Sequence, residues 1–424
     1  MYFFRKKCMK KKRVNILILS GMMVSSLLCM KETSVTTLVD HKGYASVAIT
    51  NNGEWMATGG SDQKLKLWQT KEGKSWVLMQ EVSVIKECIC SLMFDPSNTL
   101  LAVGYEYGTV VLLEKKLTDD WIFKQELLFG SNHFTFREQQ IEKLIHAKFI
   151  GEFSDLADKL KDPIEEANMN KILNYEEIEK AENHVYALSF DPNGDWLAIG
   201  FGSGALNLWG KNGYGTWDFK KQYDVKADGV CSVNFDKTGN FLVTAGTGMH
   251  NEISLYEKKS DASWEKIKKL VVGHVGTIMS AFLDASGSEL ISAGADQTLR
   301  LSIKNEETQK WDTSCVFAKM KESIFSMAIN TKEALLACGS FGDGKILLYE
   351  KKGKHKWVFA RKIGYHRVSK EHNLKNGANC LVFDPSNDYL VSGGIDGTVK
   401  IWDIHQNKKT YSTDQNLLVE EKAN

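Results

Sequence analysis

The sequence of 424 residues has little proline, almost no net charge and, beyond its first 30 residues, no long apolar run. Four prolines exclude a proline-rich or low-complexity protein. A formal net charge of +1 gives no overall basic field, which argues against a general nucleic-acid or anionic-membrane binder. After the N-terminus, no segment stays apolar over the roughly 20 residues that a transmembrane helix needs. The sequence does have 11 tryptophans, and these need an explanation.

The N-terminus has the composition of an export signal. Residues 1–30 combine seven basic residues, no acidic residue and an apolar stretch that begins at Ile16. A basic segment before a short apolar one is typical of a secretory signal. We therefore predict an exported protein, periplasmic or extracellular, with a leader that is cleaved, retained as a membrane anchor or lipidated at Cys29. The alternative is a cytoplasmic protein, and Met1 and Met9 are both candidate starts.

The sequence contains no recognisable catalytic or metal-binding motif. Six cysteines follow the leader at spacings that match no disulfide framework, and Cys88 and Cys90 share one face of an expected strand, as small core residues would. The ten histidines show no H-x-H or H-E-x-x-H spacing. Gly200–Gly204 is glycine-rich but lacks the features of a nucleophile elbow or a phosphate loop. We predict no enzymatic activity, no metal and no cofactor.

One pattern recurs seven times along the chain. It consists of an alternating apolar run, a D-P-S-N or D-x-x-G turn, a short apolar run that ends in glycine, and a second alternating run. Alternation with period two is typical of strands with one buried face. The clearest copies are Cys90–Leu113, Tyr186–Trp209 and Asn379–Trp402, and the weaker ones are Val47–Trp68, Cys231–Tyr256, Ile278–Ser302 and Phe325–Tyr349.

Tryptophan marks a fourth strand in six of the copies. Each of these tryptophans follows the end of the third run by eight or nine residues, after a polar stretch suited to a hairpin. They are Trp76, Trp121, Trp217, Trp264, Trp311 and Trp357. Four-stranded units that repeat about every 46 residues fit the blades of a β-propeller.

These repeats resemble those of the WD-repeat β-propeller family. The matching residues are Gly273-His274, Ser61-Asp62 with Trp68, Ala295-Asp296, Ile395-Asp396 and Trp402-Asp403. The resemblance implies an all-β, seven-bladed propeller over residues 34–404. It also implies a structural hydrogen-bond network of aspartate, histidine and closing tryptophan, with Asp62, Trp68, His274, Asp296, Asp396 and Trp402 as its members. The match is partial, since the fifth copy ends in Ser302 and the seventh offers His372 without a preceding glycine.

The N-terminal segment after the leader is expected to close the ring. The last copy ends at Ile404 with no tryptophan-led fourth strand after it, whereas Ser34–Val39 has strand character. We predict that this segment completes the last blade and removes the free edges of the sheet. The polar tail, residues 405–424, is expected to be loosely ordered.

An insertion interrupts the repeats between the second and third copies. Residues 131–183 contain few glycines and place apolar residues at helical spacing. They include seven basic and twelve acidic residues. We predict a small, acidic, helical insertion at the end of the propeller where the turns between second and third strands lie.

Those same turns carry the candidate partner-binding residues. Aromatic side chains on a rigid scaffold provide a large contact area at low entropic cost. We predict that a protein or peptide partner contacts Tyr105, Tyr107, Phe201, Met249, His250, Phe341 and Tyr365. The alternative is that Tyr105, Tyr107 and Phe201 hold the insertion in place. His366 and His372, in the loop before the last copy, are expected to be solvated, and the alternative is that this loop joins the same binding face.

The predicted function is a non-catalytic protein-interaction scaffold, exported or membrane-tethered, with a monomeric propeller. One alternative is an envelope assembly or anchoring factor that keeps its leader. Another is a secreted propeller with a small-ligand or enzymatic site in its central channel. That site would need acidic or histidine side chains on the innermost strands, which instead read Cys, Ser, Leu, Phe and Ala.

Overall fold

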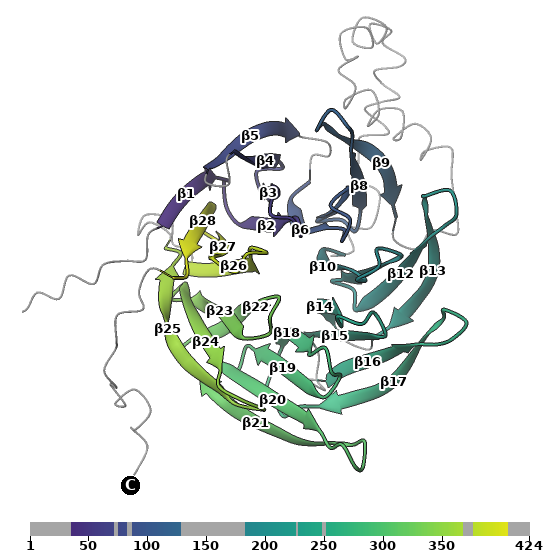
Figure 1. The fold of residues 1–424 in the computed structure, drawn as a ribbon, viewed down its shortest axis with the longest axis vertical. Coiled ribbons are helices and arrows are strands. Elements are labelled where there is room, and N and C mark those ends of the chain that lie inside the picture. The colour runs from purple at the N-terminus through teal and green to yellow at the C-terminus, as the bar shows by residue number, and fades with distance from the viewer. Residues whose placement is uncertain are drawn as a thin grey trace, which may run out of the picture. The chain divides into compact units, whose positions relative to one another are not determined.

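The computed structural model describes residues 35–71, 75–82, 87–128, 183–225, 228–247, 252–367 and 376–405. Within these ranges every regular element is a β-strand. The strands form five four-stranded antiparallel sheets and one eight-stranded sheet, which joins two further groups of four, and we call these seven groups blades 1 to 7. Figure 1 shows the blades arranged around a ring, with the first strand of each blade innermost and the fourth strand outermost. The predicted all-β, seven-bladed propeller is therefore confirmed.

The strands follow one another in chain order within each blade. Blade 1 comprises β2 (Ala45–Ile49), β3 (Trp55–Gly60), β4 (Leu65–Lys71) and β5 (Ser75–Val82). Blade 2 comprises β6 (Ile89–Phe94), β7 (Leu100–Tyr105), β8 (Val110–Lys115) and β9 (Trp121–Leu127). Blade 3 comprises β10 (Val185–Phe190), β11 (Trp196–Phe201), β12 (Ala205–Lys211) and β13 (Trp217–Asp224). Blade 4 comprises β14 (Gly229–Phe235), β15 (Phe241–Thr247), β16 (Glu252–Lys258) and β17 (Trp264–Val271).

The remaining blades repeat this order. Blade 5 comprises β18 (Ile278–Leu283), β19 (Glu289–Gly294), β20 (Thr298–Lys304) and β21 (Trp311–Lys319). Blade 6 comprises β22 (Ser323–Ile329), β23 (Leu335–Gly342), β24 (Lys345–Lys351) and β25 (Trp357–Tyr365). Blade 7 comprises β26 (Asn376–Phe383), β27 (Tyr389–Gly394), β28 (Thr398–Asp403) and the N-terminal strand β1 (Val35–Asp40).

Strand β1 closes the ring. It pairs antiparallel with β28, from Val35 opposite Trp402 to Asp40 opposite Thr398. In Figure 1 the purple β1 lies beside the yellow β28, so the two ends of the repeat array share one blade. The closing strand expected near residues 34–39 is thus found within a residue of its predicted place.

Tryptophans connect each blade to the next. The six predicted to begin fourth strands do so, since five are the first residue of their strand and Trp76 is the second residue of β5. Trp121 packs edge-on against Trp55 of blade 1, with ring centroids 5.8 Å apart, and against Phe94 of its own blade. Trp264 likewise contacts Trp196 of blade 3 at 6.1 Å. Burial of such a side chain stabilises the contact between blades by roughly 2–3 kcal/mol.

The turns between first and second strands form a second set of contacts between blades, on what we call the turn face. Prolines make three of them: Pro385 packs on Gly53, Pro96 on Gly194 and Pro192 on Gly239. In each pair the glycine belongs to the next blade and has a positive φ. The prolines of the repeat therefore join blades as well as shaping turns.

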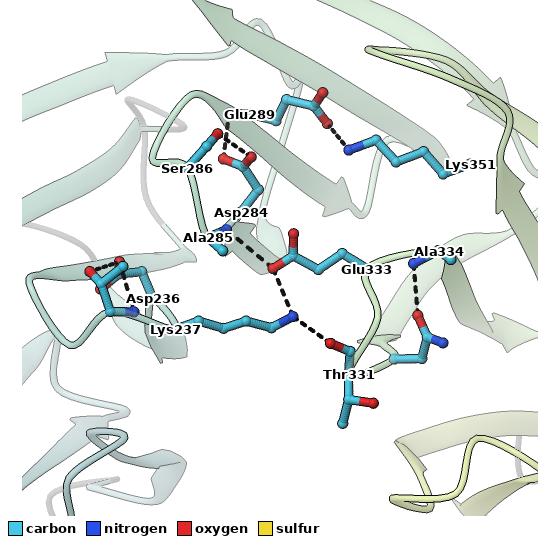
Figure 2. Close-up of polar contacts among 12 residues, drawn as sticks. Asp236, Lys237, Asp284, Ala285, Ser286, Glu289, Thr331, Glu333, Ala334 and Lys351 are labelled. Carbon is cyan, nitrogen blue, oxygen red and sulfur yellow. Dashed lines mark hydrogen bonds and ion pairs between the residues drawn. The ribbon is translucent and has the colours of Figure 1, made fainter.

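Blades 4 to 6 join their turns by polar contacts instead. Lys237 occupies the proline position in blade 4, and its ammonium donates to Thr331 O at 2.6 Å and pairs with Glu333 at 3.0 Å. Ala285 N, in the turn of blade 5, donates to the same carboxylate at 3.1 Å. Figure 2 shows Lys237 reaching from its own turn to the turn of blade 6.

Several predicted segments lie outside the described residues. They are the leader at 1–30, the helical insertion at 131–183 except Asn183, and the tail beyond His405. No helix occurs among the described elements, so the helices expected in the insertion are not supported.

Candidate functional site

One end of the ring, here called the loop face, gathers the irregular segments. Because strands within a blade are antiparallel, the loop before the first strand and the turn between second and third strands meet at the same end. The turn of blade 2 hydrogen-bonds its loop through Glu106 N and Cys88 O, and that of blade 3 through Gly202 N and His184 O. The loop face is therefore where neighbouring blades present non-repetitive side chains.

A β-bulge recurs near this face in the first strand of six blades. A bulge takes its extra residue out of the regular alternation, and bulges commonly re-aim side chains at functional sites. The bulged residues are Cys90, Tyr186, Cys231, Met279, Phe325 and Asn379. Tyr186 is 45% exposed and the other five are half-buried. Since the first strands are innermost (Figure 1), these residues belong to the strands nearest the axis of the ring.

Blade 2 departs most from its neighbours. Tyr105 ends β7 and is buried, whereas Tyr107, two residues later, is 47% exposed. Glu87, in the preceding loop, is only 5% exposed, and its carboxylate accepts a hydrogen bond from Tyr107 N at 3.4 Å. Burial, with a smaller contribution from the nearby Glu106, raises the pKa of Glu87 to about 7. The turn of blade 2 thus places the exposed ring of Tyr107 next to the buried carboxyl group of Glu87.

Two thiols and a tyrosine adjoin this acid on the side of blade 1. Tyr44 OH lies 3.4 Å from Cys90 Sγ, and Cys88 Sγ lies 3.8 Å from Ser61 O. Burial raises the pKa of the Cys88 thiol to about 11 and that of Cys90 to about 12. Thiols held neutral in this way are poor nucleophiles and poor metal ligands. Within the described part of the chain, no three histidine, cysteine or acidic side chains are placed to hold a metal ion.

Blade 3 adds an amide and two rings on the other side. Asn183 is 6% exposed and packs against Gly108 of the blade 2 turn, and its buried Oδ1 has no hydrogen-bond partner among the described residues. His184 stacks on Tyr186 with ring centroids 5.5 Å apart and planes 5° from parallel. We call this area the blade 2–3 rim, and it consists of Glu87, Glu106, Tyr107, Asn183, His184 and Tyr186.

Blade 7 contains a complete histidine–aspartate–tryptophan network. His366 Nδ1 lies 2.8 Å from Asp396, and its Nε2 lies 2.7 Å from Ser392 Oγ. Trp402 Nε1 donates to the same hydroxyl at 2.7 Å. With Nδ1–H donating to the carboxylate, the serine hydroxyl donates to Nε2 and accepts from the indole. His366, expected to be solvated, is instead fully buried, and that expectation is wrong because the residue reaches Asp396 from the end of β25.

Blades 1 and 5 contain related networks. In blade 1, His41 contacts Asp62 at 2.9 Å and Thr58 at 3.1 Å, and Trp68 donates to Thr58. In blade 5, His274 contacts Asp296 at 2.9 Å and Ser292 at 2.9 Å. The residue at the tryptophan position there is Ser302, whose buried hydroxyl has no partner among the described residues.

Burial controls the charge of these histidines. It lowers the pKa of His41, His274 and His366, although the neighbouring carboxylate opposes the shift in each case. Burial alone would raise the pKa of Asp396, but hydrogen bonds from His366 and Thr398 hold it below its ordinary value. The networks therefore keep their imidazoles neutral, in blades 5 and 7 against carboxylates of lowered pKa, as structural rather than proton-transferring groups.

The remaining predicted partner residues are not brought together. Tyr105 and Phe201 are each 1% exposed, so the prediction of exposed side chains there is wrong: both end a second strand, and Tyr105 packs between blades 1 and 2 while Phe201 packs between blades 2 and 3. Phe341 stacks on Phe325 at 5.1 Å, and the Arg367 guanidinium lies 3.9 Å from the centre of the Tyr365 ring. Met249, His250 and His372 lie outside the described residues.

Sequence reasoning missed Glu87, Asn183, Tyr186 and His41. The first three belong to loops or bulges whose direction depends on register, which periodicity does not report. His41 carried a usable signal, since it precedes the first copy by about the distance at which His274 precedes the fifth.

Comparison with known proteins agrees with the blades described above. The family described as "WD domain, G-beta repeat" matches residues 32–69, 176–210 and 366–403, which fall in blades 1, 3 and 7. A "Probable cytosolic iron-sulfur protein assembly protein 1" of Candida dubliniensis is 29% identical over 161 residues, 31% of this chain and 40% of that protein. The "Ribosome biogenesis protein YTM1" of Eremothecium gossypii is 30% identical over 206 residues, 45% of this chain and 44% of that protein.

A further relative is the "Guanine nucleotide-binding protein subunit beta-like protein" of Encephalitozoon cuniculi, 28% identical over 152 residues, 34% of this chain and 40% of that protein. The chain thus spans less than half the length of the curated relatives that it matches. The similarity therefore covers part of each relative, and it does not extend over the whole length of any of these three proteins.

The same comparison contradicts the predicted export. Relatives bear names that place them in the cytosol or on the ribosome, which favours an intracellular location. The N-terminal pattern misled because it is a feature of composition alone. A basic segment before a short apolar one does not by itself establish export. Within the described ranges, no helix has the length and apolar character needed to cross a membrane.

Seven four-stranded blades, a closing strand from the N-terminus and histidine–aspartate networks in three blades agree with the matching family repeats, and the chain is a β-propeller with WD repeats.

Proposed function

We propose that this protein is an intracellular, non-catalytic scaffold that binds a protein or peptide partner at the blade 2–3 rim. The observation that carries the proposal is the presence of two exposed rings on the loop face of neighbouring blades, Tyr107 at 47% beside the buried Glu87 and Tyr186 at 45% stacked on His184. Rigid aromatic side chains with polar neighbours are the usual anchors of protein interfaces. Names of relatives that refer to assembly and biogenesis are compatible with this role.

The rest of the loop face supports the same role. The bulged residues offer thioether, thiol and aromatic groups, and the described thiols there are held neutral. Residues 131–183 lie between β9 and β10 in the chain, and the described structure resumes at Asn183, which is a residue of the rim. We include that segment in the proposal as a neighbour of the bound partner. This replaces the two alternatives of the sequence, in which the aromatic residues either contact a partner or hold the insertion in place.

Affinity capture with matched variants tests the proposal. Tyr107→Ala with Tyr186→Ala removes the two rim rings, and Leu117→Ala with Tyr214→Ala removes two exposed apolar side chains from hairpins at the other end of blades 2 and 3. We expect the rim variant to lose the partners that the unaltered chain retains and the hairpin variant to keep them. The opposite pattern would move the binding site to the hairpins and reject the proposal.

A further inference from the structure

Two buried glutamates in the ring differ in how their charge is compensated. Glu289, at the start of β19, is 4% exposed and lies 2.8 Å from both Lys351 Nζ and His355 Nδ1. Glu87 is equally buried, but no described lysine, arginine or histidine lies within 4.0 Å of it. An unpaired buried carboxylate is costly, and such groups are usually matched by a cation or protonated. The comparison singles out Glu87 as a buried acid without a cationic partner among the described residues.

A second acceptor without a partner lies against the same turn. Glu87 contacts Tyr107 N, and Asn183 packs against the next residue, Gly108. The buried Asn183 Oδ1 accepts no hydrogen bond from the described residues. The Glu87 carboxylate accepts from Tyr107 N, and the described residues supply no donor to Asn183 Oδ1, so both groups can accept further hydrogen bonds from a group with several N–H bonds.

The surroundings favour a positively charged group. Glu106 lies in the same turn, and the exposed ring of Tyr107 belongs to the next residue of the chain. Aromatic faces attract ammonium and guanidinium groups, and carboxylates hydrogen-bond them. We infer that the blade 2–3 rim receives a lysine or arginine side chain of the bound partner, with Glu87 as its counter-ion and Asn183 Oδ1 as a second acceptor. This inference rests on the proposed function and specifies the chemistry of the partner.

The other ionisable groups around Glu87 do not compete for this role. Burial raises the pKa values of the Cys88 and Cys90 thiols to about 11 and about 12, and those of Tyr44 and Tyr105 are raised as well. These groups stay neutral near pH 7. The acids that face the incoming cation are therefore Glu87 and Glu106.

Small probes and the full-length chain test the inference. The probe is N-acetyl-arginine amide, and its neutral counterpart of the same shape is N-acetyl-citrulline amide. The carboxylate resonance of Glu87, assigned from its loss in Glu87→Gln, is followed by carbon NMR against pH with and without each probe. Glu307→Gln, an equal change of charge in an exposed hairpin of blade 5, is the control.

We expect Glu87 in the free chain to titrate near pH 7 and the arginine probe to lower its pKa towards 4.5. Citrulline amide, and the arginine probe with Glu87→Gln, should bind at least about tenfold more weakly, the scale of one hydrogen bond to a charged group. A Glu87 that titrates near 4.5 in the free chain would mean that the chain supplies its own cation, and equal binding of both probes would show no counter-ion. Either result overturns the inference.

Partner capture by the same variants tests the proposed function separately from the cationic anchor. If partner capture is lost with Tyr107→Ala and Tyr186→Ala but is unchanged with Glu87→Gln, the rim binds partners without a cationic anchor. If capture survives the loss of both rings, the rim is not the interface and both proposals fall. Loss of capture in all three variants, together with binding of the arginine probe, supports both.

Discussion

Lys237 in blade 4 pairs with Glu333 in blade 6 at 3.0 Å, across the turn of blade 5. Glu333 has a φ of 51°, at the turn position where four other blades have glycine and two have asparagine. A left-handed conformation costs a glutamate roughly 1–2 kcal/mol. The carboxylate offsets that cost by holding both Lys237 and Ala285 N (Figure 2).

Glu333→Ala and Glu333→Gly should therefore differ in a defined direction. Alanine keeps the backbone strain and removes the carboxylate, so we expect a loss of about 1–2 kcal/mol in the free energy of unfolding. Glycine removes both, and should be less destabilising than alanine by about 1 kcal/mol. Urea denaturation at neutral pH measures the two values. Equal values would mean that the left-handed backbone carries no cost at this position.

The networks of blades 5 and 7 allow a matched comparison. Ser392→Ala leaves both Trp402 Nε1 and His366 Nε2 without a partner, whereas Ser292→Ala leaves only His274 Nε2. Each orphaned buried group costs about 1–3 kcal/mol. We expect Ser392→Ala to destabilise the chain by about 2–4 kcal/mol and Ser292→Ala by about half as much. Thermal unfolding of the two variants in one buffer checks the order, and a larger loss with Ser292→Ala would contradict it.

Glu87 should make stability depend on pH in an unusual direction. Its pKa is raised from 4.5 to about 7, so between these values the folded chain holds a proton that the unfolded chain has released. Stability contributed by this group is full below pH 4.5 and falls as the pH rises to about 7. Relative to the unaltered chain, Glu87→Gln should gain stability over that window, by up to about 3 kcal/mol.

Denaturation curves between pH 4.5 and 8 measure this difference, and the exposed Glu307→Gln provides the baseline. The gain should level off above pH 7, because both folded and unfolded Glu87 are then ionised. A difference between Glu87→Gln and the unaltered chain that does not change with pH would show that Glu87 is compensated in the folded protein.

Two aromatic residues near the corresponding turns of neighbouring blades should behave oppositely when removed. Phe201 is 1% exposed and packs between blades 2 and 3, so Phe201→Ala should cost about 3–5 kcal/mol. Tyr107 is 47% exposed, and Tyr107→Ala should change stability by less than about 0.5 kcal/mol. Calorimetry of both variants distinguishes structural from surface rings, and a large loss with Tyr107→Ala would assign that ring to the core.

The sequence by itself determined the architecture. Seven copies of an alternating pattern, with turn residues and tryptophans at constant offsets, specify four-stranded blades, because strand period, turn chemistry and outer-strand packing are local properties. Even the closing strand could be placed, since the last copy lacks a fourth strand and Val35–Asp40 had no other partner.

Only the tertiary structure decided which side chains reach the surface of the loop face. Tyr105 and Tyr107 look alike in the sequence, yet one ends a strand inside the ring and the other stands in the turn beyond it. Tyr186 is exposed because a bulge shifts the register of β10 by one residue. His366 is buried because Asp396, 30 residues away, folds back against it. A shift of one residue moves a side chain to the opposite face, so position in the repeat predicts the strand but not what the residue contacts.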